Sequence, residues 1–471
     1  MLIGRESEIE TLQYCCDSDK SEFVAVYGRR RVGKTFLVKE FFGSNITFYA
    51  TGILGGDKNE QLNAWNEEMK RIGEPELAKA DDWFDAFKNL NILIEKTGGK
   101  QKKVVFLDEI PWMATGRSKF LMGLDYFWNR WASSRKDVIL IICGSAASWV
   151  TDKVINNRGG LHNRLTQHIY VRPFSLRECE LYYKSKNIPL TRYQMAEAYM
   201  IFGGIPYYLS LMKSHLSLYQ NVDAMYFSEN AMLRNELTNL YCSLFSNSDN
   251  YVKVIEALAN KGIGLSRTDI IEATKIADGG SLTKILNDLV ISGFIRKYVG
   301  YGKKERDSLY QLIDFFSLFD IRFREKREEF NTNYWLGFSS THAYSIWSGF
   351  SFEKLCLVHQ NQIRKKLGIS GVLTSFYSWR GNYEDKNVQV DLVIDRNDHV
   401  VNLCEMKFSS TEYSVSKDYS AELRRKRSAF QSSTKTRKAL VTTMVTTFGL
   451  VRNAYGMEIS SQVKLDDLFE T

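Results

Sequence analysis

Residues 28–35 read GRRRVGKT and directly follow an apolar run at residues 23–27. This order predicts a buried strand that leads into a glycine-rich loop and then into a helix. In such a loop the backbone N–H groups turn inward, where they and the helix N-terminus bind phosphate oxygens. We expect Lys34 to reach the β- and γ-phosphates of a nucleotide and the Thr35 hydroxyl to ligate Mg²⁺. The loop therefore predicts a site for ATP and Mg²⁺.

The composition narrows the class of protein. A chain of 471 residues, 44% hydrophobic and 25% charged, is typical of a globular protein with roughly three domains. The longest apolar run, 138–143, is too short to span a bilayer, and the first residues show no signal-peptide pattern. Seven cysteines without a CxxC spacing indicate reduced thiols. We therefore expect a cytoplasmic protein with no membrane partner, whose net charge of +8 permits a polyanionic partner without requiring one.

Short apolar runs alternate with helical patterns in the first 175 residues, which predicts an α/β fold with a parallel sheet. The runs are 23–27, 46–50, 104–107, 138–143 and 169–171. Asp108 and Glu109 follow the third run, at the strand end where open α/β sheets bind ligands. We expect Asp108 to hold Mg²⁺ through water and Glu109 to polarise the attacking water. Ser145, after the fourth run, is either a sensor of the γ-phosphate or part of a plain turn.

Several further boxes carry a family resemblance. Residues 4–8 read GRESE and resemble the Gly-Arg-Glu-x-Glu box that opens AAA+ and STAND-type ATPases. Other boxes resemble, in the same order, those of a prokaryotic, archaeal-type ATPase family of that kind. They lie at 108–113, 143–146, 159–164, 173–176 and 203–207. The resemblance covers about residues 1–210 and implies a P-loop ATPase core at 1–175 with a helical lid at 176–245.

The same resemblance implies roles for individual residues. Arg164 would touch the γ-phosphate and Pro206 would pack beside adenine. Alternatively, Arg164 is a solvated surface residue and the Gly-Gly-Ile-Pro turn is only a helix break. The arginines of the loop either steer anions or are solvated at its outer edge. The predicted nucleotide-binding residues are Arg5, Gly28, Arg29, Arg30, Arg31, Val32, Gly33, Lys34, Thr35, Phe36 and Pro206.

Residues 246–315 resemble a winged helix-turn-helix. Helical patterns at 252–259, 266–274 and 281–292 precede two short strands that flank a basic turn at 300–307. In DNA-binding versions the third helix enters the major groove and the wing contacts the backbone. The exposed face expected for the third helix offers only a few side chains that could read bases: Thr283, Lys284, Asn287 and Asp288. The module therefore either contacts double-stranded DNA or serves a structural or partner-binding role.

Residues 316–471 contain VQVDLVI at 388–394 and VNLCEMK at 401–407, which resemble the α/β core of PD-(D/E)xK, restriction-endonuclease-like nucleases. That chemistry needs carboxylates that hold Mg²⁺ or Mn²⁺ and a lysine that activates water. Glu405 and Lys407 are two residues apart and so share one strand face. An even-length hairpin loop would put Asp391 on the opposite face, so the nuclease interpretation requires an odd-length loop or a bulge.

Two functional hypotheses follow. In the first, Glu353 from a preceding helix joins Asp391 and Glu405 on one divalent metal with Lys407 beside it, and the chain is an ATP-regulated, DNA-directed nuclease. In the second, the chain is an ATP-dependent switch that binds DNA, protein partners or further copies of itself without cleavage. The basic run at 424–427 is either a phosphate-binding surface or a solvated helix face.

Overall fold

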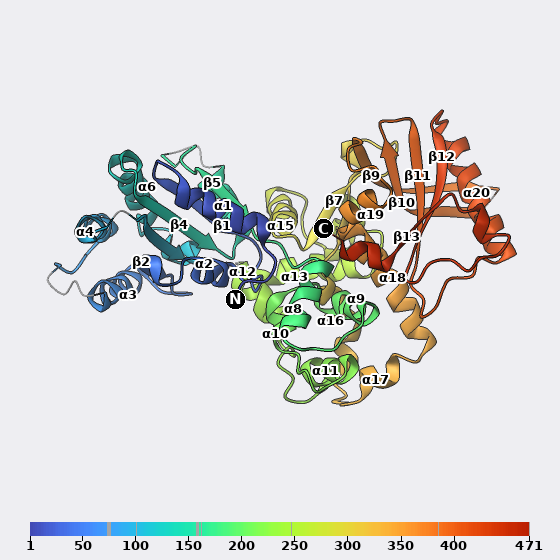
Figure 1. Ribbon diagram of the computed structural model, residues 1–471, viewed down its shortest axis with the longest axis horizontal. Helices are drawn as coiled ribbons and strands as arrows, with labels where there is room; N and C mark the ends of the chain where they lie inside the picture. The colour runs from blue at the N-terminus through green and yellow to red at the C-terminus, as the bar shows by residue number, and fades with distance from the viewer. Residues whose placement is uncertain are drawn as a thin grey trace. The chain divides into compact units, whose positions relative to one another are not determined.

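The computed structural model describes residues 1–72, 77–99, 101–156, 160–161, 163–245, 247–384 and 386–470 (Figure 1). The chain forms two compact units, Met1–Pro173 and Phe174–Thr471. The lid, winged-helix and nuclease-like regions predicted from the sequence all fall within the second unit. The seven cysteines are free thiols, as predicted. In the described ranges, no helix combines the length and the apolar character needed to cross a membrane.

The first unit is built on a five-stranded sheet with the order β2-β3-β4-β1-β5, in which neighbouring strands are parallel. Every apolar run predicted to be a strand is one. The strands are β1 (Glu22–Tyr27), β2 (Ile46–Thr51), β3 (Lys103–Asp108), β4 (Val138–Gly144) and β5 (Gln167–Tyr170). Because the strands are parallel, their carboxyl ends meet at one edge, where the predicted phosphate loop and acidic residues lie.

Helices cover the sheet of the first unit. Against one part of the sheet, large aromatic side chains such as Trp65, Trp83 and Phe87 form a dense core, and Trp65 and Trp83 meet edge to face with ring centroids 5.6 Å apart. The principal helices are α1 (Glu6–Asp17), α2 (Lys34–Phe42), α3 (Lys58–Arg71), α4 (Trp83–Lys96), α5 (Ile110–Met113), α6 (Phe120–Arg130) and α7 (Ala147–Val150). This packing holds the strand ends, and hence the site, in fixed positions.

The second unit begins with a helical region, as the sequence predicted. Its α-helices are α8 (Leu176–Ser185), α9 (Arg192–Phe202), α10 (Pro206–Ser210), α11 (Leu218–Val222) and α12 (Glu236–Leu244). Two later helices, α16 (Phe315–Arg327) and α18 (His342–Val358), pack against α9. The helical region therefore shares its core with segments that follow much later in the chain.

Between these helices lies a three-helix module with a small antiparallel sheet, order β6-β8-β7. Its elements are α13 (Ser248–Ala259), β6 (Leu265–Ser266), α14 (Arg267–Thr274), α15 (Gly280–Ile291), β7 (Ile295–Tyr298) and β8 (Leu309–Leu312). Ser266 caps α14, as predicted. The prediction that Asp288 is exposed is wrong: only 2% of it is exposed, and it accepts hydrogen bonds from Tyr251 Oη at 2.6 Å and Lys284 Nζ at 2.5 Å.

A mixed five-stranded sheet, order β9-β10-β11-β12-β13, dominates the last third of the chain. Strands β9, β10 and β11 are antiparallel neighbours, whereas β12 runs parallel to β11. Helix α20 packs against β9, β10 and β12, and α18 packs against β11 (Figure 1). The bounds are α19 (Gln360–Lys366), β9 (Thr374–Tyr383), β10 (Lys386–Arg396), β11 (Val400–Lys407), α20 (Lys417–Thr434), β12 (Ala439–Thr446) and β13 (Ser461–Lys464).

One buried histidine should make the stability of the second unit depend on pH. His359 is 2% exposed; its Nε2 accepts a hydrogen bond from Leu176 N at 3.1 Å, and its Nδ1 lies 2.8 Å from Leu355 O. Since Nε2 accepts, the proton of the neutral ring is on Nδ1. Burial lowers the pKa of His359 to about 4, below its value of about 6.5 in an unfolded chain.

Between these two pKa values the unfolded chain binds a proton that the folded chain does not bind. His359 should therefore stabilise the fold fully above about pH 6.5, and this contribution should fall by about 3 kcal/mol as the pH drops to 4. Urea unfolding of the wild type, His359→Gln and the exposed control His342→Gln at pH 7 to 4.5 would measure it. Equal acid sensitivity in all three proteins would contradict the prediction.

Candidate functional site

The phosphate loop in the first unit has the conformation that the sequence predicted. It follows β1, and α2 begins at Lys34, directly after Gly33, whose φ is 88°. Gly28 has a φ of 146°, and a Cβ there would lie 2.3 Å from Val171 O, so only glycine fits. The Lys34 ammonium donates to Arg29 O at 2.9 Å and is thus held inside the loop.

The acidic residues after β3 lie beside this loop. Thr35 Oγ1 donates to Asp108 Oδ2 at 2.7 Å, which brings together the two oxygen ligands predicted for Mg²⁺. Glu109 takes a left-handed conformation with a φ of 48°, and its Oε2 accepts from Ser145 N at 2.9 Å and Ser145 Oγ at 2.8 Å. Sequence reasoning identified Glu109 and Ser145 separately but not this direct contact.

One arginine from outside the loop braces it. Arg5 donates from Nη2 to Val32 O at 3.0 Å and from Nη1 to Arg172 O at 2.7 Å. Arg29 is 4% exposed, so the alternative that it is solvated is wrong. Arg30 and Arg31 are half-buried. The guanidinium of Arg5 therefore ties the loop to the segment that follows β5.

Three predicted contacts to the nucleotide stay predictions. Arg164 is exposed in the segment before β5, and Gly159 and His162 of its box lie outside the described residues. Pro206 begins α10, after a Gly203-Gly204 turn that ends α9, and it belongs to the second unit. Phe36 is 52% exposed.

A second set of candidate functional side chains lies on the mixed sheet. Leu392 pairs with Cys404, so the antiparallel ladder sets Asp391 opposite Glu405 on one face. The connection between β10 and β11 has three residues, which is the odd length that the nuclease interpretation required. A bulge between Val390 and Val393 also places Asp391 where the pairing with β9 is irregular, and such bulges often re-aim a side chain at a functional site.

The acidic residues of this set influence one another. Burial and then the charge of Asp391 raise the pKa of Glu405 to about 7. Burial and the charge of Asp391 also raise the pKa of Glu353, which lies on α18. Burial raises the pKa of Asp391 itself. Glu353, Asp391 and Glu405 therefore share one electrostatic environment, as predicted, and a nearby cation would favour their ionised forms.

One of these acids forms an ion pair with a lysine, and this group of described residues does not have the geometry of a metal site. Lys426 of α20 lies with Nζ 2.6 Å from Glu405 Oε2, and Met406 N donates to Asp391 Oδ2 at 3.1 Å. Among the described residues, no three His, Cys, Asp or Glu side chains are grouped to hold a metal ion. The described residues therefore do not group the three carboxylates as expected for one metal, and Lys426 and the backbone of β11 each bond one oxygen of Glu405 and Asp391, respectively.

The predicted catalytic lysine and the basic run have different contacts from those expected. Lys407 Nζ lies 4.9 Å from the centre of the Tyr419 ring. Arg424 pairs with Glu458 at 2.9 Å, whereas Lys426 points inward and its side chain is 13% exposed. The run 424–427 is therefore not a continuous phosphate-binding surface.

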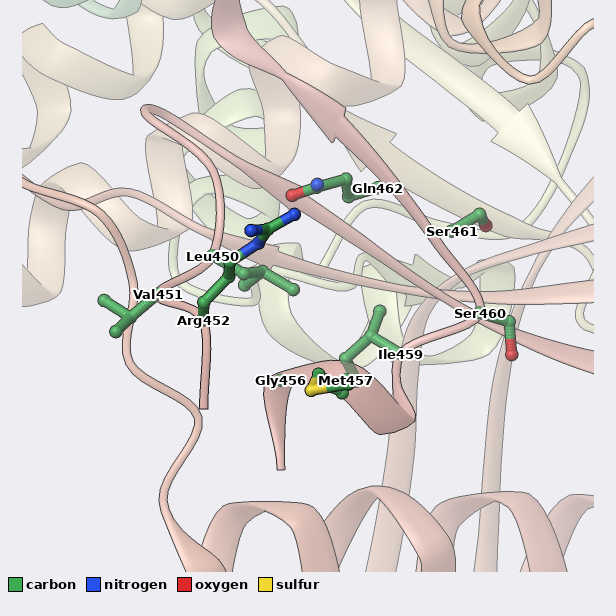
Figure 2. A pocket seen from close by; sticks show the side chains of 9 residues that line it. All are labelled: Leu450, Val451, Arg452, Gly456, Met457, Ile459, Ser460, Ser461 and Gln462. Carbon is green, nitrogen blue, oxygen red and sulfur yellow. The ribbon is translucent and has the colours of Figure 1, made fainter. Parts of the chain in front are cut away.

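A separate cavity of about 360 Å³ lies near β13. Figure 2 shows the side chains of Arg452 and Gln462 extending toward one another, with Met457 and Ile459 nearby. Arg452 is the one charged side chain in this lining, all of which is described. The cavity thus brings no carboxylate to the chemistry considered above.

Comparisons with known proteins agree with the first site. Residues 2–212 match the model of a family described as an ATPase domain predominantly from Archaea. A Walker-type ATPase of Pyrococcus abyssi has a similar fold, with a TM-score of 0.50 and 18% identity over 68% of this chain and 96% of that one.

Two relatives are known from Methanocaldococcus jannaschii. An uncharacterised protein is 24% identical over 415 residues, or 87% of this chain and 88% of that protein. An uncharacterised ATP-binding protein is 44% identical over 41 residues, or 9% of this chain and 70% of that protein. With the phosphate loop and its acidic partners in place, residues 2–212 belong to this family of archaeal-type P-loop ATPase domains.

Proposed function

We propose that the chain binds and hydrolyses ATP and that this activity regulates a metal-dependent nuclease acting on double-stranded DNA. The contact of Thr35 with Asp108 at the mouth of the phosphate loop carries the first half of the proposal. Mg²⁺ bound with ATP would neutralise part of the charge on the phosphates. Lys34 would leave Arg29 O for the phosphates, and Glu109 would accept a proton from the attacking water.

The resting contact between Ser145 and Glu109 supports a regulated ATPase. While Glu109 Oε2 accepts two hydrogen bonds from Ser145, that oxygen is less free to accept a hydrogen bond from the attacking water. A γ-phosphate that attracts the Ser145 hydroxyl would release one of these bonds. Arg164 is the proposed further contact of the γ-phosphate, from its own subunit or from a second copy.

One observation carries the nuclease half of the proposal. Within the described part of the chain, Glu405 Oε1 is buried and has no hydrogen-bond partner, although Glu405 lies opposite Asp391. An unsatisfied buried carboxylate oxygen beside a second carboxylate suits a divalent cation such as Mg²⁺ or Mn²⁺. Asp391 and Glu405 would hold the metal, Glu353 would border it, and Lys407 would stabilise the developing charge.

A non-catalytic switch is the second candidate, and the ion pair between Lys426 and Glu405 favours it. Lys426 already neutralises the carboxylate that a metal would use. In addition, the burial of Asp288 reduces the base-reading set on α15. In this case, the winged-helix-like module and the mixed sheet would bind DNA or a protein partner without cleavage.

Two assays on the full chain test the proposal. Phosphate release from ATP with Mg²⁺ tests the ATPase, with Lys34→Ala as the variant that should not bind ATP. Conversion of supercoiled plasmid with Mg²⁺ or Mn²⁺, with and without ATP, tests the nuclease. Absence of phosphate release contradicts the ATPase assignment, and ATP hydrolysis with no plasmid cleavage under either metal selects the switch.

A further inference from the structure

A small cavity in the second unit joins the winged-helix-like module to the acidic set. Its volume is about 150 Å³. The turn after α13 and strands β7 and β8 form part of its lining, and α18, β9 and β10 form the rest. The lining contains the carboxyl groups of Glu353 and Asp391 together with three cationic side chains, those of Arg296, Lys354 and Arg380.

The first two cations are bonded to neutral oxygen atoms of the fold. Lys354 is 6% exposed, and its ammonium donates to Gly262 O. Arg296 donates from Nε to Gln311 Oε1 at 2.6 Å, and its guanidinium lies 4.4 Å from the centre of the Tyr298 ring. Neither cation lies within ion-pair distance of a carboxylate in the described ranges, although the charge of Glu353 in the same lining acts on Lys354. Lys354 and Arg296 also repel each other, so an entering anion that contacts both would be favoured.

The remaining polar groups make the lining suitable for a phosphate. Arg380 donates to Gln389 Oε1 from Nε at 3.0 Å and from Nη2 at 2.6 Å, and Ser378 lies in the same lining. A guanidinium and an ammonium side by side are the usual recognition groups for phosphate oxygens. The volume is below the roughly 300–1,000 Å³ of pockets that enclose whole ligands of nucleotide size. A single phosphate group therefore fits better than a nucleoside.

We propose that this cavity binds the terminal phosphate of a nucleic-acid strand, beside the site where Asp391 and Glu405 would act. The inference rests on the proposed nuclease function. An internal phosphodiester would require space for nucleosides on both sides, whereas a strand end needs space on one side only. The cavity thus recognises strand ends that carry a phosphate, including the new ends that cleavage of a closed plasmid produces, with residues of two modules contributing to the recognition.

The test uses full-length protein in a Lys34→Ala background, because the loop at 28–35 also binds phosphate. Without divalent metal, inorganic phosphate should raise the Tm relative to chloride of equal ionic strength. Lys354→Met and Arg296→Gln should each abolish the shift, and the exposed control Lys186→Met should keep it. Lys354→Met retains the apolar stem and removes a buried charge, so it should fold. An identical phosphate shift in all variants would overturn the proposal.

Single-stranded oligonucleotides identify the source of the phosphate. A 5′- or 3′-phosphorylated oligonucleotide should bind about tenfold more tightly than the same oligonucleotide with hydroxyl ends, and Lys354→Met should remove the difference. Equal affinity for both ends, or a mononucleotide that binds as tightly as the oligonucleotide, would overturn the proposal. A phosphate preference without plasmid cleavage would support the cavity and reject the nuclease; cleavage without the preference would do the reverse.

Discussion

Replacing Glu109 by glutamine is expected to slow ATP hydrolysis about 100-fold or more while ATP still binds. The amide cannot accept a proton from water, yet its oxygen can still accept the hydrogen bonds that Ser145 N and Oγ donate to Glu109 Oε2. The phosphate loop, Lys34 and Asp108 are unchanged. Phosphate release and equilibrium binding of ATP would measure the two effects separately.

The exposed glutamate Glu67 provides a matched control for this experiment, since Glu67→Gln makes the same chemical change on α3. It should hydrolyse ATP at the wild-type rate. If Glu109→Gln also hydrolyses ATP at that rate, Glu109 is not the base. If it fails to bind ATP, its left-handed backbone position has a structural role instead.

Replacing Glu405 by glutamine is expected to reduce metal-dependent DNA cleavage about 100-fold or more and to leave ATP hydrolysis unchanged. The amide is a weaker ligand for a hard cation, and the substitution removes charge where a metal would bind. Plasmid cleavage in Mg²⁺ and Mn²⁺ would measure the loss, with the exposed Glu412→Gln as control. Equal cleavage by all three proteins would show that the mixed sheet is not the nuclease.

A second variant is needed to distinguish loss of activity from loss of stability, because Glu405→Gln leaves Lys426 without its charged partner. Breaking a buried pair in this way costs about 3–5 kcal/mol. Asp391→Asn removes a carboxylate that no described side chain pairs with at ion-pair distance, so the fold should tolerate it better. Loss of cleavage in both variants, with Asp391→Asn fully folded, would separate a chemical effect from unfolding.

Local patterns were sufficient to predict the first unit. A strand, a glycine loop and a helix follow one another directly in the sequence around Gly28, and Asp108 ends its strand, so both positions could be read from short segments. The bond between Ser145 and Glu109 could not be predicted, because it depends on the left-handed backbone of Glu109. The burial of Arg29 likewise depends on how the loop packs.

In the last third of the chain, the alternation of side chains along a hairpin correctly required, for the nuclease interpretation, a loop of odd length between β10 and β11. The contacts of Glu405 with Lys426 and of Asp391 with Met406 N were not predicted. The inward position of Lys426 was readable in principle. Leu423, Lys426 and Phe430 follow one another at intervals of three and four residues, which places them on one helix face, and Leu423 and Phe430 are buried. Asp288 was wrongly expected to be exposed because it is charged. In the structure it is buried, and a hydrogen bond from Tyr251 stabilises it there.

The close packing of Gly28 against Val171 has a mechanical consequence. Because Gly28 has no side chain, the phosphate loop packs directly against the backbone after β5. Arg5 links the same two segments by hydrogen bonds to Val32 O and Arg172 O. The first unit ends at Pro173. A displacement of the phosphate loop would therefore also move the backbone at residues 171–172, because no free space separates the two segments.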